Sequence, residues 1–153
     1  MPSNTVNTTA DPFVDTDVII RLLTGDDPDK GAEAAVLFQA VEAGNLSLLA
    51  PDTVIADAVY VLSSPRLYNL PRLQIQALLM PLLRLPGFKV RNRQSIIRAL
   101  ELYASTRLDF WDALIVASME QQGSRVLYSY DTHFDHISSV DRRSPKGVIH
   151  GQQ

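Results

Sequence analysis

The sequence of 153 residues contains no cysteine. This absence excludes disulfides, thiolate metal sites and cysteine nucleophiles, and it suits the reducing cytosol. Long uncharged stretches are missing too: the longest one within the expected fold covers residues 73–83, about half of the roughly 20 residues that a membrane-spanning helix needs. Residues 1–11 have no basic or apolar run, so they do not read as a signal peptide. We therefore expect a soluble, cytoplasmic protein.

The sequence does contain enough apolar residues for one ordinary core. Hydrophobic residues make up 46% of the chain, which is typical of a globular protein. The length corresponds to one domain that can bury a sizeable core without disulfides. We expect this domain over residues 12–145, between a loose N-terminal tail at 1–11 and a C-terminal tail at 146–153.

Charge is distributed unevenly along the chain. Between Arg66 and Arg107 there are eight basic residues and one acid, Glu101, so this segment carries +7 of a total charge of −3. The flanks are therefore acidic. A polyanionic partner bound by the middle, with a metal held by the flanks, would explain the pattern. Solvated helix faces that merely differ in charge would explain it as well, and on charge alone that is the more common case.

Apolar periodicity predicts short strands alternating with helices. No two consecutive strands are joined by a tight hairpin, which favours a parallel sheet covered by helices on both faces, an α/β fold. The strands are expected at residues 12–14, 46–49, 88–90 and 126–130. The helices are expected to start just after residue 15 and to cover 28–43, 52–62, 73–85 (interrupted or bent by Pro81), 95–106 and 110–122.

Four aspartates stand out against this pattern. Asp15 and Asp131 each follow a predicted strand, and ligands of parallel α/β sheets bind beyond the carboxyl ends of the strands. Asp57 and Asp112 lie inside apolar helical stretches, where a charge is costly unless it is paired or binds a cation. A carboxylate cluster suits Mg²⁺ or Mn²⁺, whereas zinc favours His or Cys.

Three of the acids also have a structural explanation. Asp109 and Asp15 are suited to capping the helices that follow them. Asp57 would be unremarkable on an exposed turn of an amphipathic helix. The convergence of several acids, and no single one of them, is therefore what points to a site.

The histidines in the segment 131–136 allow two interpretations. His133 and His136 are residue types that bind metals, and a histidine can act as a general base. Surface histidines in loops are more common than ligands, and the chain offers only one such segment.

Four segments resemble the acidic blocks of PIN domains, specifically VapC-like toxin ribonucleases of type II toxin–antitoxin systems. They are FVDTDVIIRLL at residues 13–23, VIADAVYVL at 54–62, LDFWDALIVA at 108–117 and LYSYDTHF at 127–134. The resemblance covers about residues 13–140, in the order and spacing of the family. Each block is weakly specific alone, and the four together are fairly specific.

This resemblance implies a three-layer α/β/α fold with a central parallel sheet and a catalytic, metal-binding quartet of Asp15, Asp57, Asp112 and Asp131. It also implies cleavage of RNA phosphodiester bonds with Mg²⁺ or Mn²⁺. Such hydrolysis needs an activated water and a stabilised leaving oxygen, which one or two metal ions supply. The carboxylates would hold the ions and need not accept the proton themselves.

Three positions depart from the family pattern. Asp57 stands where Glu is usual and is one methylene shorter. Asp17 stands where Asn or Ser is usual, and His133 where an acid is often found. These departures imply reduced activity or a changed metal preference.

The resemblance also implies partners. An antitoxin would insert a basic side chain among the acids, and a homodimer would form through apolar helices such as residues 73–85. The +7 segment would contact RNA phosphates. Tyr68 and Phe88 within it are candidates for stacking on bases, with core packing the alternative for Phe88.

Two other functions fit part of the sequence. Asp15-Thr16-Asp17 after a strand is similar to the motif of haloacid-dehalogenase-type phosphatases, with Asp15 as nucleophile and Asp17 as acid. The chain lacks the expected downstream Lys and the Gly-Asp-rich acidic loop of that class. The second alternative is a non-catalytic PIN-like module that binds RNA or protein.

Overall fold

A computed structural model describes residues 10–146, so most of both expected tails (residues 1–9 and 147–153) lies outside the described part. The chain divides into two compact units, Met1–Ile97 and Arg98–Gln153, called here the first and the second unit. Each is described by itself. None of the helices in the described part has the length and apolar character needed to cross a membrane.

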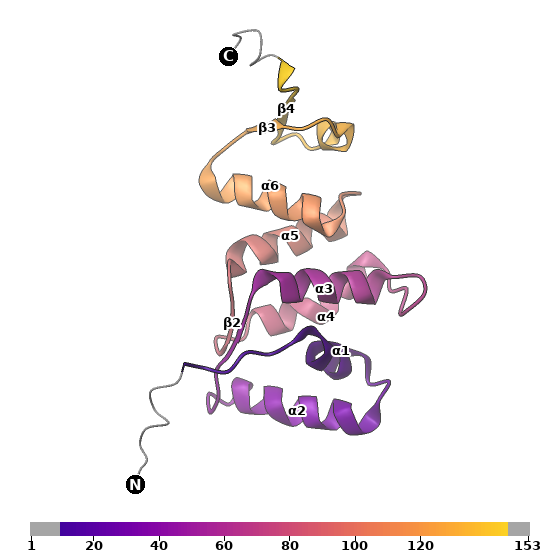
Figure 1. Cartoon of the computed structure of the whole chain (residues 1–153), viewed down its shortest axis with the longest axis vertical. Helices are drawn as coiled ribbons and strands as arrows, with labels where there is room; N and C mark the ends of the chain where they lie inside the picture. The colour runs from indigo at the N-terminus through magenta and orange to yellow at the C-terminus, as the bar shows by residue number, and fades with distance from the viewer. Residues whose placement is uncertain (1–9, 147–153) are drawn as a thin grey trace. The chain divides into compact units, whose positions relative to one another are not determined.

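The first unit follows the predicted alternation closely (Figure 1). Asp15 caps the first helix and Gly25, at φ 67°, ends it in a left-handed conformation that glycine adopts without strain. Its elements are α1 (Thr16–Thr24), α2 (Pro28–Glu42), β1 (Leu48–Ala50), α3 (Asp52–Ser63), α4 (Arg72–Leu83), β2 (Phe88–Val90) and the start of α5 (Arg93–Ser105).

β1 and β2 pair in parallel, with Leu48 opposite Phe88 and Ala50 opposite Val90. Both strands are buried except for the middle residue of each. Phe13 forms a single parallel bridge to Leu49, so the expected strand at residues 12–14 is present as one bridge.

Helices cover this pair of strands. α1 packs on α2 and α3, and α3 packs on α4 (Figure 1). The ring of Phe88 is fully buried and meets that of Phe38 edge to face, with 5.5 Å between centroids. α4 continues through Pro81 to Leu83. The Arg93 guanidinium then donates hydrogen bonds to the backbone oxygens of Leu83, the last residue of α4, and of Leu85 just beyond it.

The second unit contains the rest of α5, α6 (Phe110–Gln122), β3 (Val126–Tyr128), the 3-10 helix η2 (Thr132–His136) and β4 (Asp141–Arg143). β3 and β4 pair in parallel, with Leu127 opposite Arg142. Gly123 ends α6 at φ 70°, at the position that the sequence predicted.

The α/β class with parallel strands is therefore confirmed, and every predicted helix is present. The strands of the described part pair in parallel within each unit, as β1–β2 and β3–β4. β4 and η2 were not predicted, because Asp141-Arg142-Arg143 has no apolar alternation and η2 is only five residues long.

Candidate functional site

Asp15 is held at the point where the bridged segment turns into α1. The Val14 amide donates to the Leu49 oxygen at 3.0 Å, and the Leu49 amide donates to the Pro12 oxygen at 2.8 Å. The Asp15 carboxylate accepts a hydrogen bond from the Thr16 amide at 2.7 Å and remains exposed. The side chain therefore both caps α1 and lies at the carboxyl edge of the strands, as predicted.

Asp57 lies on the exposed face of α3, although its neighbours Ile55, Ala56, Ala58 and Val59 are buried. The apolar neighbours thus turn into the core while the carboxylate turns outward. This agrees with the amphipathic alternative and explains why the charge is tolerated there.

Asp15 and Asp57 line the same cavity, which has a volume of about 480 Å³. A third carboxylate, that of Asp17, lines it as well. The sequence singled out this residue as a departure from the family pattern and as the acid of the phosphatase alternative, and not as a member of the metal-binding quartet. The remaining lining residues are Thr16, Ile20, Arg21, Tyr60, Val61, Leu67 and Tyr68.

Arg21, the basic residue that lines this cavity, is paired with Asp26. Arg21 Nη1 lies 3.0 Å from Asp26 Oδ1, and the Tyr68 hydroxyl donates to the other oxygen of Asp26. Hydrogen bonds from Tyr68, then Thr24 and Arg21, lower the pKa of Asp26 to about 2. Donating that bond to the Asp26 carboxylate raises the pKa of Tyr68. Arg21 is thus tied to Asp26, which is not among the residues that line the cavity.

Asp112 lies in the first turn of α6, where the helix dipole favours a negative charge. Asp109 caps this helix by accepting a hydrogen bond from the Asp112 amide at 2.9 Å, so its predicted capping role is confirmed. Burial raises the pKa of Asp112, and the negative charges of Asp109 and Asp131 raise it further. Asp112 is therefore a half-buried carboxylate within electrostatic reach of a second one.

Asp131 caps η2, three residues after the end of β3. Its carboxylate accepts hydrogen bonds from the His133 amide at 2.9 Å and lies 2.7 Å from His133 Nδ1. The bond from the His133 backbone is the main reason why the pKa of Asp131 is lowered. Arg142 steadies the same loop: it bonds both carboxylate oxygens of Asp135 and the Ser129 oxygen.

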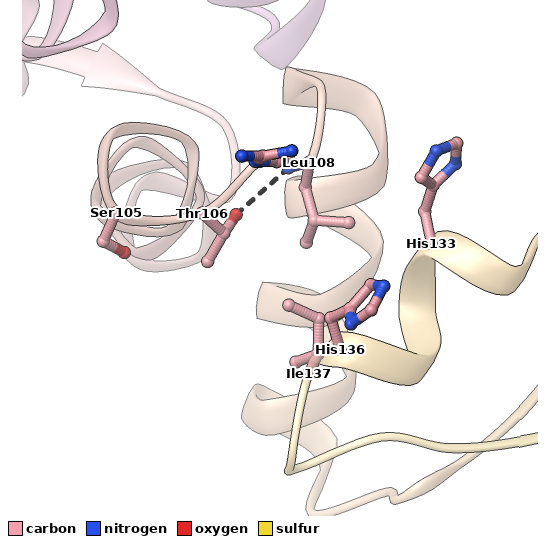
Figure 2. Close-up of a pocket in the computed structure, with 7 residues that line it drawn as sticks. Ser105, Thr106, Leu108, His133, His136 and Ile137 are labelled. Atoms are coloured by element: carbon pink, nitrogen blue, oxygen red, sulfur yellow. Dashed lines mark hydrogen bonds between the residues drawn. The ribbon is translucent and has the colours of Figure 1, made fainter.

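A second cavity of about 530 Å³ lies within the second unit (Figure 2). His133 and His136 approach it from η2, opposite the turn that connects α5 to α6, where Thr106 Oγ1 accepts a hydrogen bond from the Leu108 amide. The His133 side chain is 79% exposed, with one ring nitrogen on Asp131. Both histidines are thus surface residues, and His133 orients Asp131.

The structure arranges the four predicted acids as two pairs, Asp15 with Asp57 and Asp112 with Asp131. Within either unit, residues 10–146 contain no group of three or more acidic or histidine side chains placed to hold a metal ion. The donors in both pairs are carboxylate oxygens, the type that Mg²⁺ and Mn²⁺ prefer. The site of four acids stays a prediction.

Part of the basic segment serves the fold. Arg93 caps α4, Lys89 pairs with Asp11 at 3.3 Å, and Arg98 pairs with Glu120 at 2.7 Å and with Glu101. Four further arginines of the segment are exposed: Arg66, Arg84, Arg91 and Arg107. The interpretation of the charge as ordinary helix faces and that of a phosphate-binding surface therefore each account for some of these residues.

Comparisons with known proteins give one positive result. No curated protein matches the chain. The sequence profile of the PIN domain matches residues 13–140, a range that includes parts of both units and all four predicted acids. On this coverage, the chain belongs to the PIN-domain family.

Proposed function

We propose that this protein is a metal-dependent endoribonuclease. Most PIN domains are nucleases, and the typical member is a metal-dependent ribonuclease. The observation that carries the proposal is the pairing of the four acids at family positions: Asp15 and Asp57 line one cavity, and Asp131 acts electrostatically on Asp112. Carboxylates gathered without an equal number of cations are expected where a divalent ion is bound.

In this proposal Asp15, Asp57, Asp112 and Asp131 would hold Mg²⁺ or Mn²⁺. The bound ion supplies a water that is acidic enough to be deprotonated at neutral pH, and it stabilises charge on the leaving oxygen.

The remaining contacts orient these carboxylates. The Thr16 amide holds one oxygen of Asp15, and the two contacts from His133 hold Asp131. The bond between Asp26 and Arg21 occupies the basic side chain found among the described residues that line the first cavity. This cation is therefore engaged elsewhere, and the negative charge of Asp15 and Asp57 stays available to a metal.

The proposal is tested with the full-length protein, a labelled RNA and Mg²⁺. Asp15→Asn and Asp112→Asn each keep the shape of the side chain but remove its charge, so we expect each to lower the cleavage rate at least about 100-fold. Chelation of the metal with EDTA should have the same effect. Asp29→Asn is the matched control, because Asp29 is an exposed acid in the first turn of α2.

Cleavage that persists in both variants would refute the proposal. RNA binding without any cleavage by the wild type would favour the alternative of a non-catalytic PIN module. Metal-dependent hydrolysis of p-nitrophenyl phosphate that needs Asp15 but not Asp112 would instead favour the phosphatase.

We further propose that this nuclease is a cytoplasmic toxin that is held inactive by an antitoxin and forms a homodimer. Support for the dimer comes from α4, where Leu73, Ala77 and Pro81 form an exposed apolar stripe at a spacing of four residues. Growth arrest on expression, relieved by the product of a neighbouring gene, tests the toxin role. A shift from dimer to monomer in Leu73→Lys, measured by light scattering, tests the interface.

A further inference from the structure

Tyr60 is a large aromatic side chain that the fold leaves in solvent. It lies on α3 and is 71% exposed. A single exposed tyrosine is ordinary on a protein surface. This one, however, lines the cavity that contains Asp15 and Asp57, and Leu67, which is 59% exposed, lines the same cavity. The acidic cavity therefore has an apolar side that packing within the first unit does not account for.

Tyr60 is close to the proposed metal ligand on its own helix. It follows Asp57 by three residues, so the two side chains are neighbours on one face of α3. Both are exposed and both line the cavity. A ligand in contact with the carboxylate is thus within reach of the aromatic ring.

The two aromatic residues that the sequence suggested for base stacking are engaged elsewhere. Phe88 is fully buried against Phe38, so core packing is its role. Tyr68 lines the cavity but is half-buried, with its hydroxyl donating to Asp26. Tyr60 is therefore the aromatic residue of this cavity that offers an open ring face.

Charge indicates which part of an RNA can meet this ring. Asp15, Asp17 and Asp57 make the cavity acidic, and its arginine, Arg21, is paired with Asp26. A phosphate beside these acids is repelled unless a cation lies between them. An uncharged nucleobase has no such penalty, and its flat face matches a tyrosine ring.

We propose that Tyr60 binds the RNA substrate by stacking on an unpaired base next to the phosphodiester bond that is cut. This inference rests on the proposed ribonuclease function and assigns one of its binding residues. Stacking tolerates any base, because every base has a flat face. Tyr60 therefore contributes affinity and position for single-stranded RNA without fixing a sequence.

Binding is measured by fluorescence anisotropy, with full-length protein, Mg²⁺ and a fluorescein-labelled unstructured RNA. An Asp112→Asn background slows cleavage and leaves every residue of the Tyr60 cavity intact. We expect Tyr60→Ala to weaken binding roughly 5- to 150-fold and Tyr60→Phe to bind within about twofold of the parent, because the ring is what stacks. Val36→Ala, which removes an apolar side chain that is 66% exposed on α2, is the control and should bind like the parent.

A series of RNAs with one abasic nucleotide at successive positions identifies the contact. At the stacked position the abasic RNA should bind the parent as weakly as intact RNA binds Tyr60→Ala, and the two changes together should add nothing. If Tyr60→Ala loses the same affinity for every abasic RNA, the stacking proposal is overturned.

The two proposals fail in different ways. If the wild type cleaves RNA but Tyr60→Ala binds RNA as well as the parent, the stacking inference is wrong and the nuclease function stands; a protein segment would then be the better candidate for the apolar side of the cavity. If the parent binds no RNA and the wild type cleaves none, both proposals are wrong. Circular dichroism of each variant checks that the fold is retained.

Discussion

The two sheets of this protein have the same size and the same parallel pairing but very different surroundings. In β1–β2, Leu48 is 2% exposed and Phe88 is fully buried. In β3–β4, Val126 is 37% and Tyr128 is 49% exposed. The first sheet is thus stabilised by burial of apolar surface, whereas the described residues of the second give it little of that stabilisation.

The hydrogen bonds made by arginine side chains also differ between the two units. In the first unit, Arg93 donates to backbone oxygens at the end of α4, so its charge secures a buried helix. In the second unit, Arg142 joins the Ser129 oxygen to the Asp135 carboxylate on η2. Short strands without a packed face are therefore held by side-chain hydrogen bonds, and these same bonds steady the loop of Asp131.

The largest difference in stability between the two sheets should appear when one aromatic ring is removed from each. Phe88→Ala leaves a cavity in the core and should lower the free energy of unfolding by about 3–5 kcal/mol. Tyr128→Ala removes a half-exposed ring and should cost less than about 1 kcal/mol. Urea denaturation of both variants measures this. Equal losses of unfolding free energy in the two variants would show that the two sheets contribute equally to stability.

Replacing Arg93 in the first unit and Arg142 in the second should change stability less, and more locally. Arg93→Ala removes charged hydrogen bonds at the end of α4 and should lower the free energy of unfolding by about 2 kcal/mol. Arg142→Ala should mainly speed amide hydrogen exchange at Ser129, whose amide donates to the Arg143 oxygen in the β3–β4 pairing. Unchanged exchange in that variant would mean that Arg142 does not hold the strands together.

The smallest effect should be the pH dependence of the Arg21–Asp26–Tyr68 cluster in the first unit. The pKa of Asp26 is lowered from 3.8 to about 2, so the folded state favours the ionised carboxylate. Its contribution to stability is complete above about pH 4 and is lost as the pH falls towards 2. The stability difference between the wild type and Asp26→Asn should therefore shrink over that interval. A carbon-13 NMR titration that places the Asp26 pKa near 3.8 would contradict this.

Much of the site follows from local patterns. Asp15 and Asp131 follow strand-like segments, and Asp109 precedes an apolar helical run, so their places at element ends are encoded within a few residues. The contacts of Asp26 with Arg21 and Tyr68 had no comparable signal, because Tyr68 is 42 residues away in the sequence. The open ring of Tyr60 was missed for a related reason: exposure depends on which face of α3 the core covers.

The sequence alone determined the helices and the parallel α/β class, and it predicted the four candidate acids, since these depend on periodicity, capping and motif order. Only the tertiary structure decided that Asp57 turns outward, that it shares a cavity with Asp15 and Tyr60, and that Arg21 is paired with Asp26. The physical reason is that burial and charge pairing arise between segments distant in the chain. Local sequence specifies an element, whereas its packing partners specify which of its side chains meet solvent.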